Sequence, residues 1–401
     1  MRQRLPALVF AALAFASSRL PADAPDATLV LEWNEVALAA VAAERQPAPE
    51  GARTMAMVHA AILRGLEAAD SADRAALEAA TAVAARDVLT SVFPARQADF
   101  EAAWARSTSR IPDGPSKAAG LGFGRAAAKL VVEARQGDGS GAPNDERPRT
   151  DPGVYVPTAL PVGRSWAAVR PWFLGRGAQV RPGAPPSLSS AEWARDYEEV
   201  RTLGTAVASQ RTAEQTEVAK FWAIVGPVTW NPVVRSLVVS MKLDLVDASR
   251  MFALCNMAAM DAFIAVFDAK YEYSFWRPIT AIRNGDRDDN DATTRDSVWQ
   301  PLIDTPPHPE YPCAHCISSA AVGAVLEARF GAGEVPPISM TSIAIPGVTR
   351  RWTKISDYVA EVSDARVWAG VHYRNSTVVG QAMGRKIGEM AAGKLGTEPP
   401  R

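Results

Sequence analysis

One long apolar run constrains the fold more than any other feature of the sequence. Residues 246–270 carry apolar side chains on nearly every face of a helix, and such a helix is stable only when other elements cover it on all sides. Asp261 lies inside the run, where a carboxylate needs a cation or hydrogen-bond donors to offset its burial. For Asp261 the sequence leaves two interpretations: a structural ion pair, or a residue that supports a neighbouring functional site. The run predicts a central, buried helix.

The remaining sequence predicts an all-α protein. Apolar residues recur at helical spacing through most of the chain, and no alternating apolar and polar run is long enough for a convincing strand. Residues 141–190 differ, because many of the 30 prolines lie there and such a density favours an irregular surface connection. We therefore expect an N-terminal helical region over 27–140, this connection, and a C-terminal helical region over 191–396.

Charge and hydropathy argue against two classes of partner. The chain has 43 Lys and Arg against 44 Asp and Glu, without the basic excess of a nucleic-acid-binding protein. Beyond the first twenty residues, no uncharged apolar run approaches the roughly 18 residues of a membrane span. We expect no nucleic-acid partner and no integral membrane segment in the mature chain. The oligomeric state is open.

The N-terminus has the pattern of a secretory leader. Arg2 and Arg4 precede an apolar stretch over 5–18, and the small residues Ala14 and Ala16 offer a cleavage site. A signal peptide within residues 1–24 is the favoured interpretation, and a membrane anchor or a buried first helix is the alternative. The mature protein would then be exported, to the periplasm or the medium, and its three cysteines would meet an oxidising environment.

Two features of the N-terminal half favour a structural role. His59 lies on the apolar stripe of a helix predicted around residues 55–66, which is typical of a core histidine. Gly120, Gly122 and Gly124 have the spacing of a phosphate-binding loop. No strand pattern precedes these glycines, however, and close helix packing explains them as well.

Three segments of the C-terminal half carry the residues with the most chemistry. Lys270 and Arg277 lie at the end of the long apolar run. Because Pro278 disfavours a helical conformation in the residue before it, we expect Arg277 just past the helix end. The other two segments supply Cys313, Ala314, His315 and Cys316 at the predicted start of a helix, and then Arg366 and His372.

These residue types suit a tetrahedral oxyanion such as phosphate or vanadate. Arginine supplies planar pairs of N–H donors, lysine a point charge, and the free N–H groups of a helix start a partial positive charge. One cation–anion pair at about 4 Å gains roughly 4 kcal/mol at an effective dielectric constant of 20, so several converging cations bind a multiply charged anion tightly. One histidine could attack or ligate the central atom while the other transfers protons.

The order of these motifs resembles the vanadium-dependent haloperoxidase and type 2 phosphatidic acid phosphatase superfamily, and most of all its soluble bacterial haloperoxidase-like branch. The pattern of that superfamily is K-x6-R-P, then P-S-G-H, then S-R-x5-H. Its first motif is intact from Lys270 to Pro278, and Trp276 and the segments 299–303 and 308–312 also look like that branch. The resemblance implies a fold of helical bundles with the catalytic region in the C-terminal half.

The resemblance also implies a role for each residue. Those that would bind the oxygens of vanadate or phosphate are Lys270, Arg277, Arg366, Cys313 and the amide of Ala314. His372 would be the axial ligand of vanadium, or the nucleophile of a phosphatase, and His315 would be the acid–base residue. The implied activity is oxidation of a halide by hydrogen peroxide with vanadate as cofactor. The alternatives are hydrolysis of phosphomonoesters through a phosphohistidine and oxyanion binding without catalysis, so the partners are small molecules in each case.

Three residues depart from the superfamily pattern, and the smallest of these departures is Ala365 before Arg366, where the pattern has serine. Cys313 stands where the pattern has serine and Ala314 where it has glycine. A thiol is a weaker hydrogen-bond donor than a hydroxyl, and beside activated peroxide it risks oxidation. The spacing of Cys313 and Cys316 also leaves open a redox pair, a disulfide that closes the turn, and a zinc site completed by His308 and His315.

Overall fold

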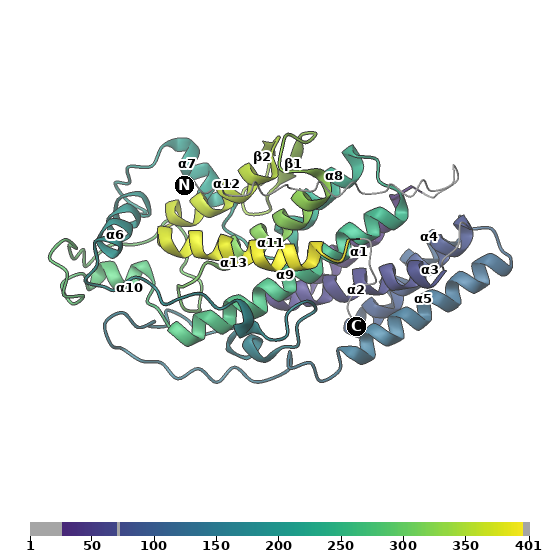
Figure 1. Ribbon diagram of the computed structural model, residues 1–401, viewed down its shortest axis with the longest axis horizontal. Coiled ribbons are helices and arrows are strands. Elements are labelled where there is room, and N and C mark those ends of the chain that lie inside the picture. The colour runs from purple at the N-terminus through teal and green to yellow at the C-terminus, as the bar shows by residue number, and fades with distance from the viewer. Residues whose placement is uncertain (1–25, 70–72, 396–401) are drawn as a thin grey trace, which may run out of the picture.

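The computed structural model describes residues 26–69 and 73–395, and a long buried helix is its central element. Helix α9 (Leu245–Tyr273) runs through the middle of the molecule (Figure 1). By length and composition alone α9 could cross a membrane, but 94% of its most apolar window is buried inside the protein. A helix covered in this way is a core helix, and the prediction over 246–270 is confirmed.

The N-terminal bundle packs on one side of α9. It consists of α1 (Thr28–Ala43), α2 (Ala48–Ala69), α3 (Arg74–Val92), α4 (Gln97–Thr108) and α5 (Pro115–Ala134). Helix α2 contacts α9, α3 and α5. Gly120 and Gly124 let α5 approach α3 closely, since a Cβ atom at Gly120 would lie 2.1 Å from the carbonyl oxygen of Ala76. These glycines therefore serve helix packing.

A group of buried polar side chains joins this bundle to α9 and to α8 (Pro227–Ser240). Asn34 Nδ2 donates to Asn231 Oδ1 at 2.8 Å and to His59 Nε2 at 2.9 Å. Asn231 and Asn256 donate to each other at 3.0 Å in both directions. Burial lowers the pKa of His59 to about 3, so its ring is neutral. We call Asn34, His59, Asn231 and Asn256 the amide cluster, and the structural role predicted for His59 is confirmed.

The chain between α5 and α6 (Ala191–Leu203) is irregular apart from two short 3-10 turns, Arg164–Ala168 and Gly177–Val180. Asp261 of α9 anchors it. The Asp261 carboxylate accepts hydrogen bonds from the backbone N–H groups of Trp172, Phe173 and Leu174 at 2.7 to 3.1 Å. Its partners are thus mainly backbone donors, and its role is to hold this connection on the core helix.

The C-terminal bundle packs beside the second half of α9. It includes α11 (Ala314–Phe330), α12 (Ile355–Trp368) and α13 (Arg374–Ala392), with α7 (Ala213–Phe221) and α10 (Pro278–Arg283) near them. Gly384 lets α13 lie directly on α11, since a Cβ atom there would be 2.2 Å from the carbonyl oxygen of Ile317. The predicted all-α fold is confirmed.

Two short strands interrupt this helical architecture. β1 (Ile338–Thr341) pairs antiparallel with β2 (Thr349–Trp352), and Ile338 lies opposite Trp352. Strands of four residues give too few alternations to be seen in the sequence.

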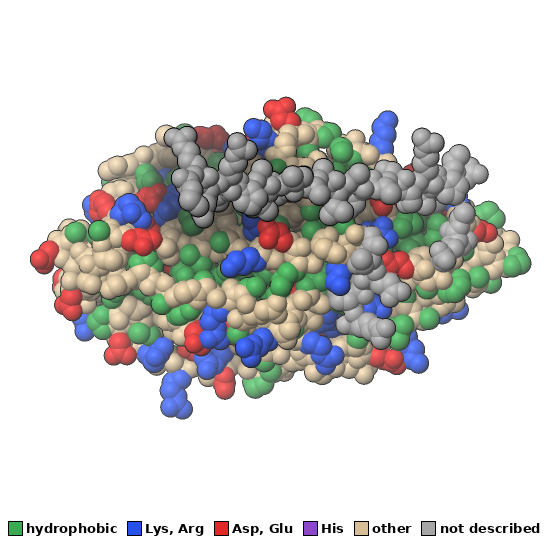
Figure 2. All heavy atoms as spheres, in the orientation of Figure 1, with side chains coloured by type: hydrophobic (Ala, Val, Ile, Leu, Met, Phe, Trp, Pro, Cys, Tyr) green, Lys and Arg blue, Asp and Glu red, His purple; other side chains and the backbone are tan. Residues whose placement is uncertain are grey.

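The surface charge agrees with the nearly equal numbers of basic and acidic residues in the sequence. On the face shown in Figure 2, acidic and basic side chains are interspersed with apolar ones. All four histidines, in contrast, are buried in the protein. The predicted signal peptide over 1–24 lies outside the described residues.

Candidate active site

The end of α9 places Lys270 inside the protein. Its side chain is fully buried, and Nζ donates to the carbonyl oxygens of Pro309 and Glu310 at 2.8 and 2.9 Å. Helix α9 ends at Tyr273, and Ser274 adopts a left-handed conformation with φ 46°. The chain turns there, so Arg277 precedes α10, outside either helix, as its position before proline predicts.

Arg277 is fully buried and holds two loops together. Its Nε donates to the carbonyl oxygen of His308 at 2.9 Å, and Nη2 contacts His308 Nδ1 at 2.9 Å. Its Nη1 donates to the carbonyl oxygen of Val371 at 2.7 Å and lies 3.3 Å from His372 Nε2. Arg277 therefore joins the loop before α11 to the loop between α12 and α13.

Arg366 and His315 have polar atoms without a partner among residues 26–69 and 73–395. Arg366, in the last turn of α12, is fully buried. Its Nη1 donates to the carbonyl oxygen of Trp222 at 2.6 Å, but Nε and Nη2 have no partner. His315, in the first turn of α11, bonds through its ring to the carbonyl of Ile224, and its Nε2 has no partner.

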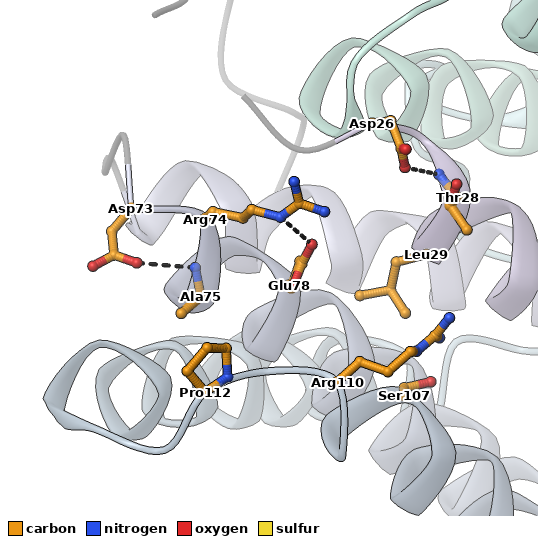
Figure 3. A pocket seen from close by; sticks show the side chains of 10 residues that line it. All are labelled: Asp26, Thr28, Leu29, Asp73, Arg74, Ala75, Glu78, Ser107, Arg110 and Pro112. Carbon is orange, nitrogen blue, oxygen red and sulfur yellow. Dashed lines mark hydrogen bonds and ion pairs between the residues drawn. The ribbon is translucent and has the colours of Figure 1, made fainter. Parts of the chain in front are cut away.

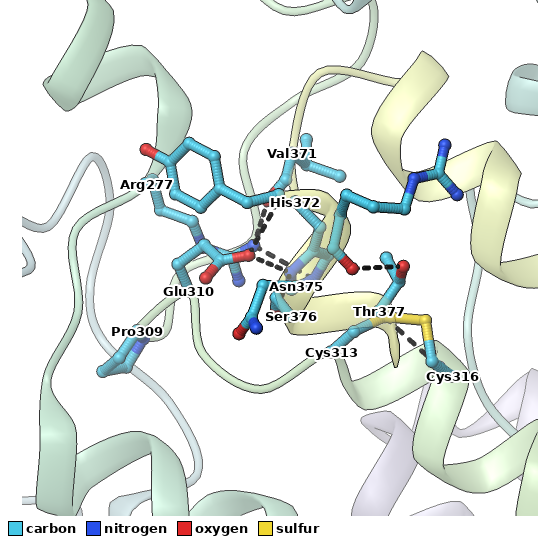
Figure 4. A network of polar contacts seen from close by, with 12 residues as sticks. Arg277, Pro309, Glu310, Cys313, Cys316, Val371, His372, Asn375, Ser376 and Thr377 are labelled. Atoms are coloured by element: carbon cyan, nitrogen blue, oxygen red, sulfur yellow. Dashed lines mark hydrogen bonds and ion pairs between the residues drawn. A yellow bond between two sulfur atoms is a disulfide. The ribbon is translucent and has the colours of Figure 1, made fainter. Parts of the chain in front are cut away.

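His372 pairs with a carboxylate (Figure 4). Its Nδ1 lies 2.7 Å from Oε1 of Glu310, which also accepts a hydrogen bond from the backbone N–H of Tyr373 at 3.1 Å. The hydroxyl of Ser376 lies 3.4 Å from the same ring nitrogen. Both His372 and Glu310 are buried, and burial raises the pKa of Glu310 to about 7, against the pull of Arg277 and Lys270.

These residues form one buried group, which we call the cation cluster: Lys270, Arg277, Glu310, His315, Arg366 and His372. Its charges do not balance, because three cations face one carboxylate. Burial lowers the pKa of Arg366 to about 9 and that of Arg277 to about 10, and it lowers the pKa of Lys270 far below the usual value. Mutual repulsion adds to the effect at Arg366 and Lys270. Buried charges of one sign need a counter-ion, so the cluster is suited to an anion.

Cys313 differs from its predicted role. Its sulfur forms a disulfide with Cys316 (Figure 4), so no thiol hydrogen is available to donate to an anion. Instead, the Cys316 N–H donates to the Cys313 sulfur at 3.3 Å, which caps the start of α11. The amide of Ala314 remains a candidate donor, since Ala314 begins α11 and a first-turn N–H group has no acceptor within its helix.

The disulfide also argues against the zinc site among the other interpretations of the cysteine pair. A zinc site would need both sulfurs as thiolates, and the disulfide occupies them. Within residues 26–69 and 73–395, no three His, Cys, Asp or Glu side chains are grouped so that they could hold a metal ion.

The structure brings five of the seven residues proposed from the sequence into the cation cluster and places Cys313 and Ala314 at the start of α11, next to His315. It also adds two residues that the sequence reasoning did not assign to the site. Glu310 pairs with His372, and His308 pairs with Arg277. The available signal was an acidic residue between prolines, in the loop just before the helix that carries His315. Sequence spacing alone did not reveal which histidine this carboxylate would meet.

A separate surface pocket lies away from the cation cluster. A pocket of about 550 Å³ opens between α1, α3 and the turn after α4 (Figure 3). The charged groups at its rim pair within the protein, as Arg74 does with Glu78 at 2.9 Å and Arg110 with Glu32 at 3.0 Å. This pocket therefore lacks the unpaired, buried charge that distinguishes the cation cluster.

The region that contains the cation cluster is similar to known proteins. Residues 250–397, which include the whole cation cluster, match the family described as the VCPO second helical-bundle domain. A vanadium chloroperoxidase of Curvularia inaequalis is 28% identical over 168 residues, which are 34% of this chain and 28% of that protein. The chain thus spans less than a third of that relative in the matched region.

Solved structures extend the similarity over the whole chain. The first bacterial vanadium-dependent iodoperoxidase superposes with a TM-score of 0.78 and 20% identity, covering 94% of this chain and 98% of that one. The chain has the vanadium haloperoxidase fold. The apo form of a bacterial vanadium-dependent chloroperoxidase has a TM-score of 0.67 at 16% identity, with coverage of 94% and 95%.

Within the vanadium haloperoxidase fold, each member of the cation cluster comes from a defined place. Lys270 lies on the central helix, Arg277 and Glu310 on loops, His315 on α11, Arg366 on α12, and His372 just before α13. Helix α9, the disulfide and the glycine contacts of α13 hold these elements against one another. Rigid supports of this kind keep binding groups in a fixed geometry.

Proposed function

We propose that this protein is a vanadate-dependent haloperoxidase, which oxidises a halide with hydrogen peroxide. The observation that carries the proposal is the excess of buried positive charge, with unpaired N–H groups on Arg366, within a vanadium haloperoxidase fold. The residues present fit an oxyanion. Arg366 Nε and Nη2 are buried N–H groups without partners among the described residues, and a tetrahedral oxyanion can supply acceptors to such groups.

Each side chain then has a distinct task. Lys270, Arg277 and Arg366 would bind the oxygens of vanadate, and His372 Nε2 would supply a nitrogen lone pair. The bound vanadate would supply the electrophilic centre at which hydrogen peroxide becomes an oxidant for halide. His315 holds a neutral ring, because burial and the nearby Arg366 keep its pKa well below the usual value. A neutral imidazole accepts a proton, so His315 Nε2 can receive the proton that leaves peroxide.

The net reaction consumes one proton, as hydrogen peroxide, halide and a proton give hypohalous acid and water. A group that both accepts and returns a proton is therefore needed near the oxyanion. His315 is the histidine of the cation cluster whose free ring nitrogen has no partner, whereas both ring nitrogens of His372 have neighbours. This difference supports the assignment of His315 to proton transfer.

The test is the oxidation of iodide and bromide by purified protein with hydrogen peroxide, before and after loading with orthovanadate. We expect turnover that requires vanadate and that is lost in Arg366→Ala and in His372→Ala. Arg329→Ala is the control, because Arg329 pairs with Asp247 at 3.0 Å in a half-exposed position. Activity retained in both site variants would contradict the proposal. Hydrolysis of phosphomonoesters without halide oxidation would favour the phosphatase, and anion binding without either activity would favour a binding protein.

We also propose that the mature chain is exported, to the periplasm or the medium. The disulfide between Cys313 and Cys316 supports this proposal, because disulfides persist mainly in oxidising compartments. Fractionation of the native host, followed by sequencing of the mature N-terminus, tests it.

A further inference from the structure

Glu310 is fixed in place from both sides. Its backbone N–H donates to the carbonyl oxygen of Phe275 at 2.9 Å, and its own carbonyl oxygen accepts from Lys270 Nζ at 2.9 Å. The carboxylate is fully buried and lies 2.7 Å from His372 Nδ1. The backbone N–H of Tyr373, the residue after His372, donates to the same oxygen at 3.1 Å. The contact between Glu310 and His372 is therefore set by the backbone of two loops.

Arg277 determines which nitrogen of His372 carries the proton. Nη1 of Arg277 lies 3.3 Å from Nε2 of His372, and a guanidinium group only donates hydrogen bonds. Nε2 must therefore accept, and in a neutral imidazole the other nitrogen then carries the hydrogen. The Nδ1–H group points at Glu310 Oε1, which accepts it. The reverse arrangement would set two donors, Nε2–H and Arg277 N–H, against each other.

We propose that Glu310 is a positioning residue that fixes the proton of His372 on Nδ1 and so keeps Nε2 free of hydrogen, with a lone pair that a bound oxyanion can engage in place of Arg277. The part of this inference that concerns the anion rests on the proposed function. The position of the proton does not, since it follows from Arg277 and Glu310 alone.

The position of the proton matters more for vanadate than for phosphate. A phosphate ion bound by charge and hydrogen bonds can accept a hydrogen bond from an Nε2–H group. Coordination to vanadium requires a free lone pair on that nitrogen. Moving the proton from Nδ1 to Nε2 should thus weaken vanadate binding selectively, and the ratio of the two affinities reports on the tautomer.

Two variants that are both neutral at position 310 separate the effect of the hydrogen bond to His372 from the effect of the negative charge of Glu310. Glu310→Gln removes the negative charge but keeps an oxygen that can accept from Nδ1. Glu310→Met removes both the charge and the acceptor at similar volume. Asp288→Asn is the control, because it neutralises another buried carboxylate, one that accepts from Trp193 Nε1 and the Thr293 hydroxyl. Circular dichroism and thermal unfolding establish that each full-length variant is folded.

The first readout is the protonation of the ring nitrogens in full-length protein with 15N-labelled histidine. The chain has only four histidines, and His372→Gln assigns the signal. We expect Nδ1–H in the wild type, in Glu310→Gln and in Asp288→Asn, and a mixture or Nε2–H in Glu310→Met. Nε2–H in the wild type, or pure Nδ1–H in Glu310→Met, would overturn the proposal.

The second readout is the affinity for orthovanadate divided by that for orthophosphate, each measured by calorimetric titration. This ratio should fall at least tenfold in Glu310→Met and stay within threefold of the wild type in Glu310→Gln. An unchanged ratio in Glu310→Met would overturn the link between the tautomer and the anion. A wild-type protein that binds neither anion would contradict the proposed function, while the labelling result would still decide the role of Glu310 toward His372.

Discussion

The amide cluster and the cation cluster are both buried against α9, but they differ in how their polar atoms are satisfied. In the amide cluster, the side-chain amides of Asn34, Asn231 and Asn256 hydrogen bond to one another, to Trp230 Nε1 and to Arg235 Nη2. In the cation cluster, N–H groups of Arg366 and a ring nitrogen of His315 lack partners among the described residues, and positive charge is in excess, whereas the amide cluster has no charged member and only Nδ1 of His59 lacks a partner there. A satisfied polar group stabilises a fold, whereas an unsatisfied one costs free energy. The difference separates a part of the core that maintains the structure from the part that we propose binds an oxyanion.

The largest effect is expected for Arg366. Arg366→Met replaces a buried cation with an apolar side chain of similar length. We expect anion affinity to fall more than a hundredfold, since a pair involving a buried charge is worth roughly 3–5 kcal/mol when one partner is removed. Without anion, the free energy of unfolding should be unchanged or higher by about 1–3 kcal/mol, because an uncompensated buried charge is gone. Calorimetric titration and urea unfolding in phosphate-free buffer measure the two quantities. Lower stability together with unchanged affinity would make Arg366 part of the structural core.

The amide cluster should respond in the opposite way. Asn256→Ala leaves Trp230 Nε1 and Asn231 Nδ2 without their acceptor. Each buried group left unpaired costs about 1–3 kcal/mol, so the free energy of unfolding should fall by about 3 kcal/mol while anion affinity stays within twofold. Urea unfolding and calorimetric titration of the same sample test both statements. A loss of anion binding in the folded variant would contradict the conclusion that the two clusters have separate roles.

Cys313→Ser tests whether the side chain at position 313, next to the cation cluster, contacts the anion. The serine would restore a hydroxyl donor at the start of α11, and a hydrogen bond to a charged group contributes roughly 1.5 kcal/mol or more. We expect vanadate affinity to rise about tenfold relative to Cys316→Ser, which also removes the disulfide but adds no hydroxyl at position 313. Equal affinities in the two variants would mean that the side chain at this position does not contact the anion.

The smallest expected effect concerns pH. The pKa of His59 is about 3 in the folded protein because of burial, and an unfolded chain titrates near 6.5. His59 therefore makes its full contribution to the free energy of unfolding above pH 6.5. This contribution is lost as the pH falls from 6.5 to about 3, and the free energy of unfolding then falls by at most about 1.4 kcal/mol per pH unit. His59→Gln should reduce this slope by that amount, with or without anion. Urea unfolding at pH 7, 6 and 5 measures the slope, and an unchanged slope would contradict the assignment.

The sequence predicts well what depends on local pattern. The apolar run over 246–270 predicts α9, and the proline after Arg277 predicts that this arginine lies beyond the helix end. The motif residues Lys270 and Arg366 are brought together as the resemblance implies, since both help to form one buried group. These features follow from helical periodicity, proline stereochemistry and motif order.

The features that the sequence does not predict depend on contacts between distant segments. Asp261 finds its partners about ninety residues away, in an irregular segment without a periodic pattern. Glu310 meets His372 across two loops whose paths are set by Lys270 and Arg277. Neither of these pairings has a signature in local sequence. The disulfide between Cys313 and Cys316 is local, and the spacing of the two cysteines leaves it open among other interpretations without deciding for it.

The most direct test of the difference between the two clusters is thermal and urea unfolding of the wild-type protein in phosphate-free buffer, with and without orthovanadate or orthophosphate. An anion that binds only the folded state stabilises it by about 2.7 kcal/mol at one hundred times its dissociation constant. We predict a stabilisation that grows with the logarithm of the anion concentration in the wild type and in Asn256→Ala, and that is absent in Arg366→Met. An unfolding midpoint unchanged by either anion in the wild type would contradict the proposal that the cation cluster binds an oxyanion.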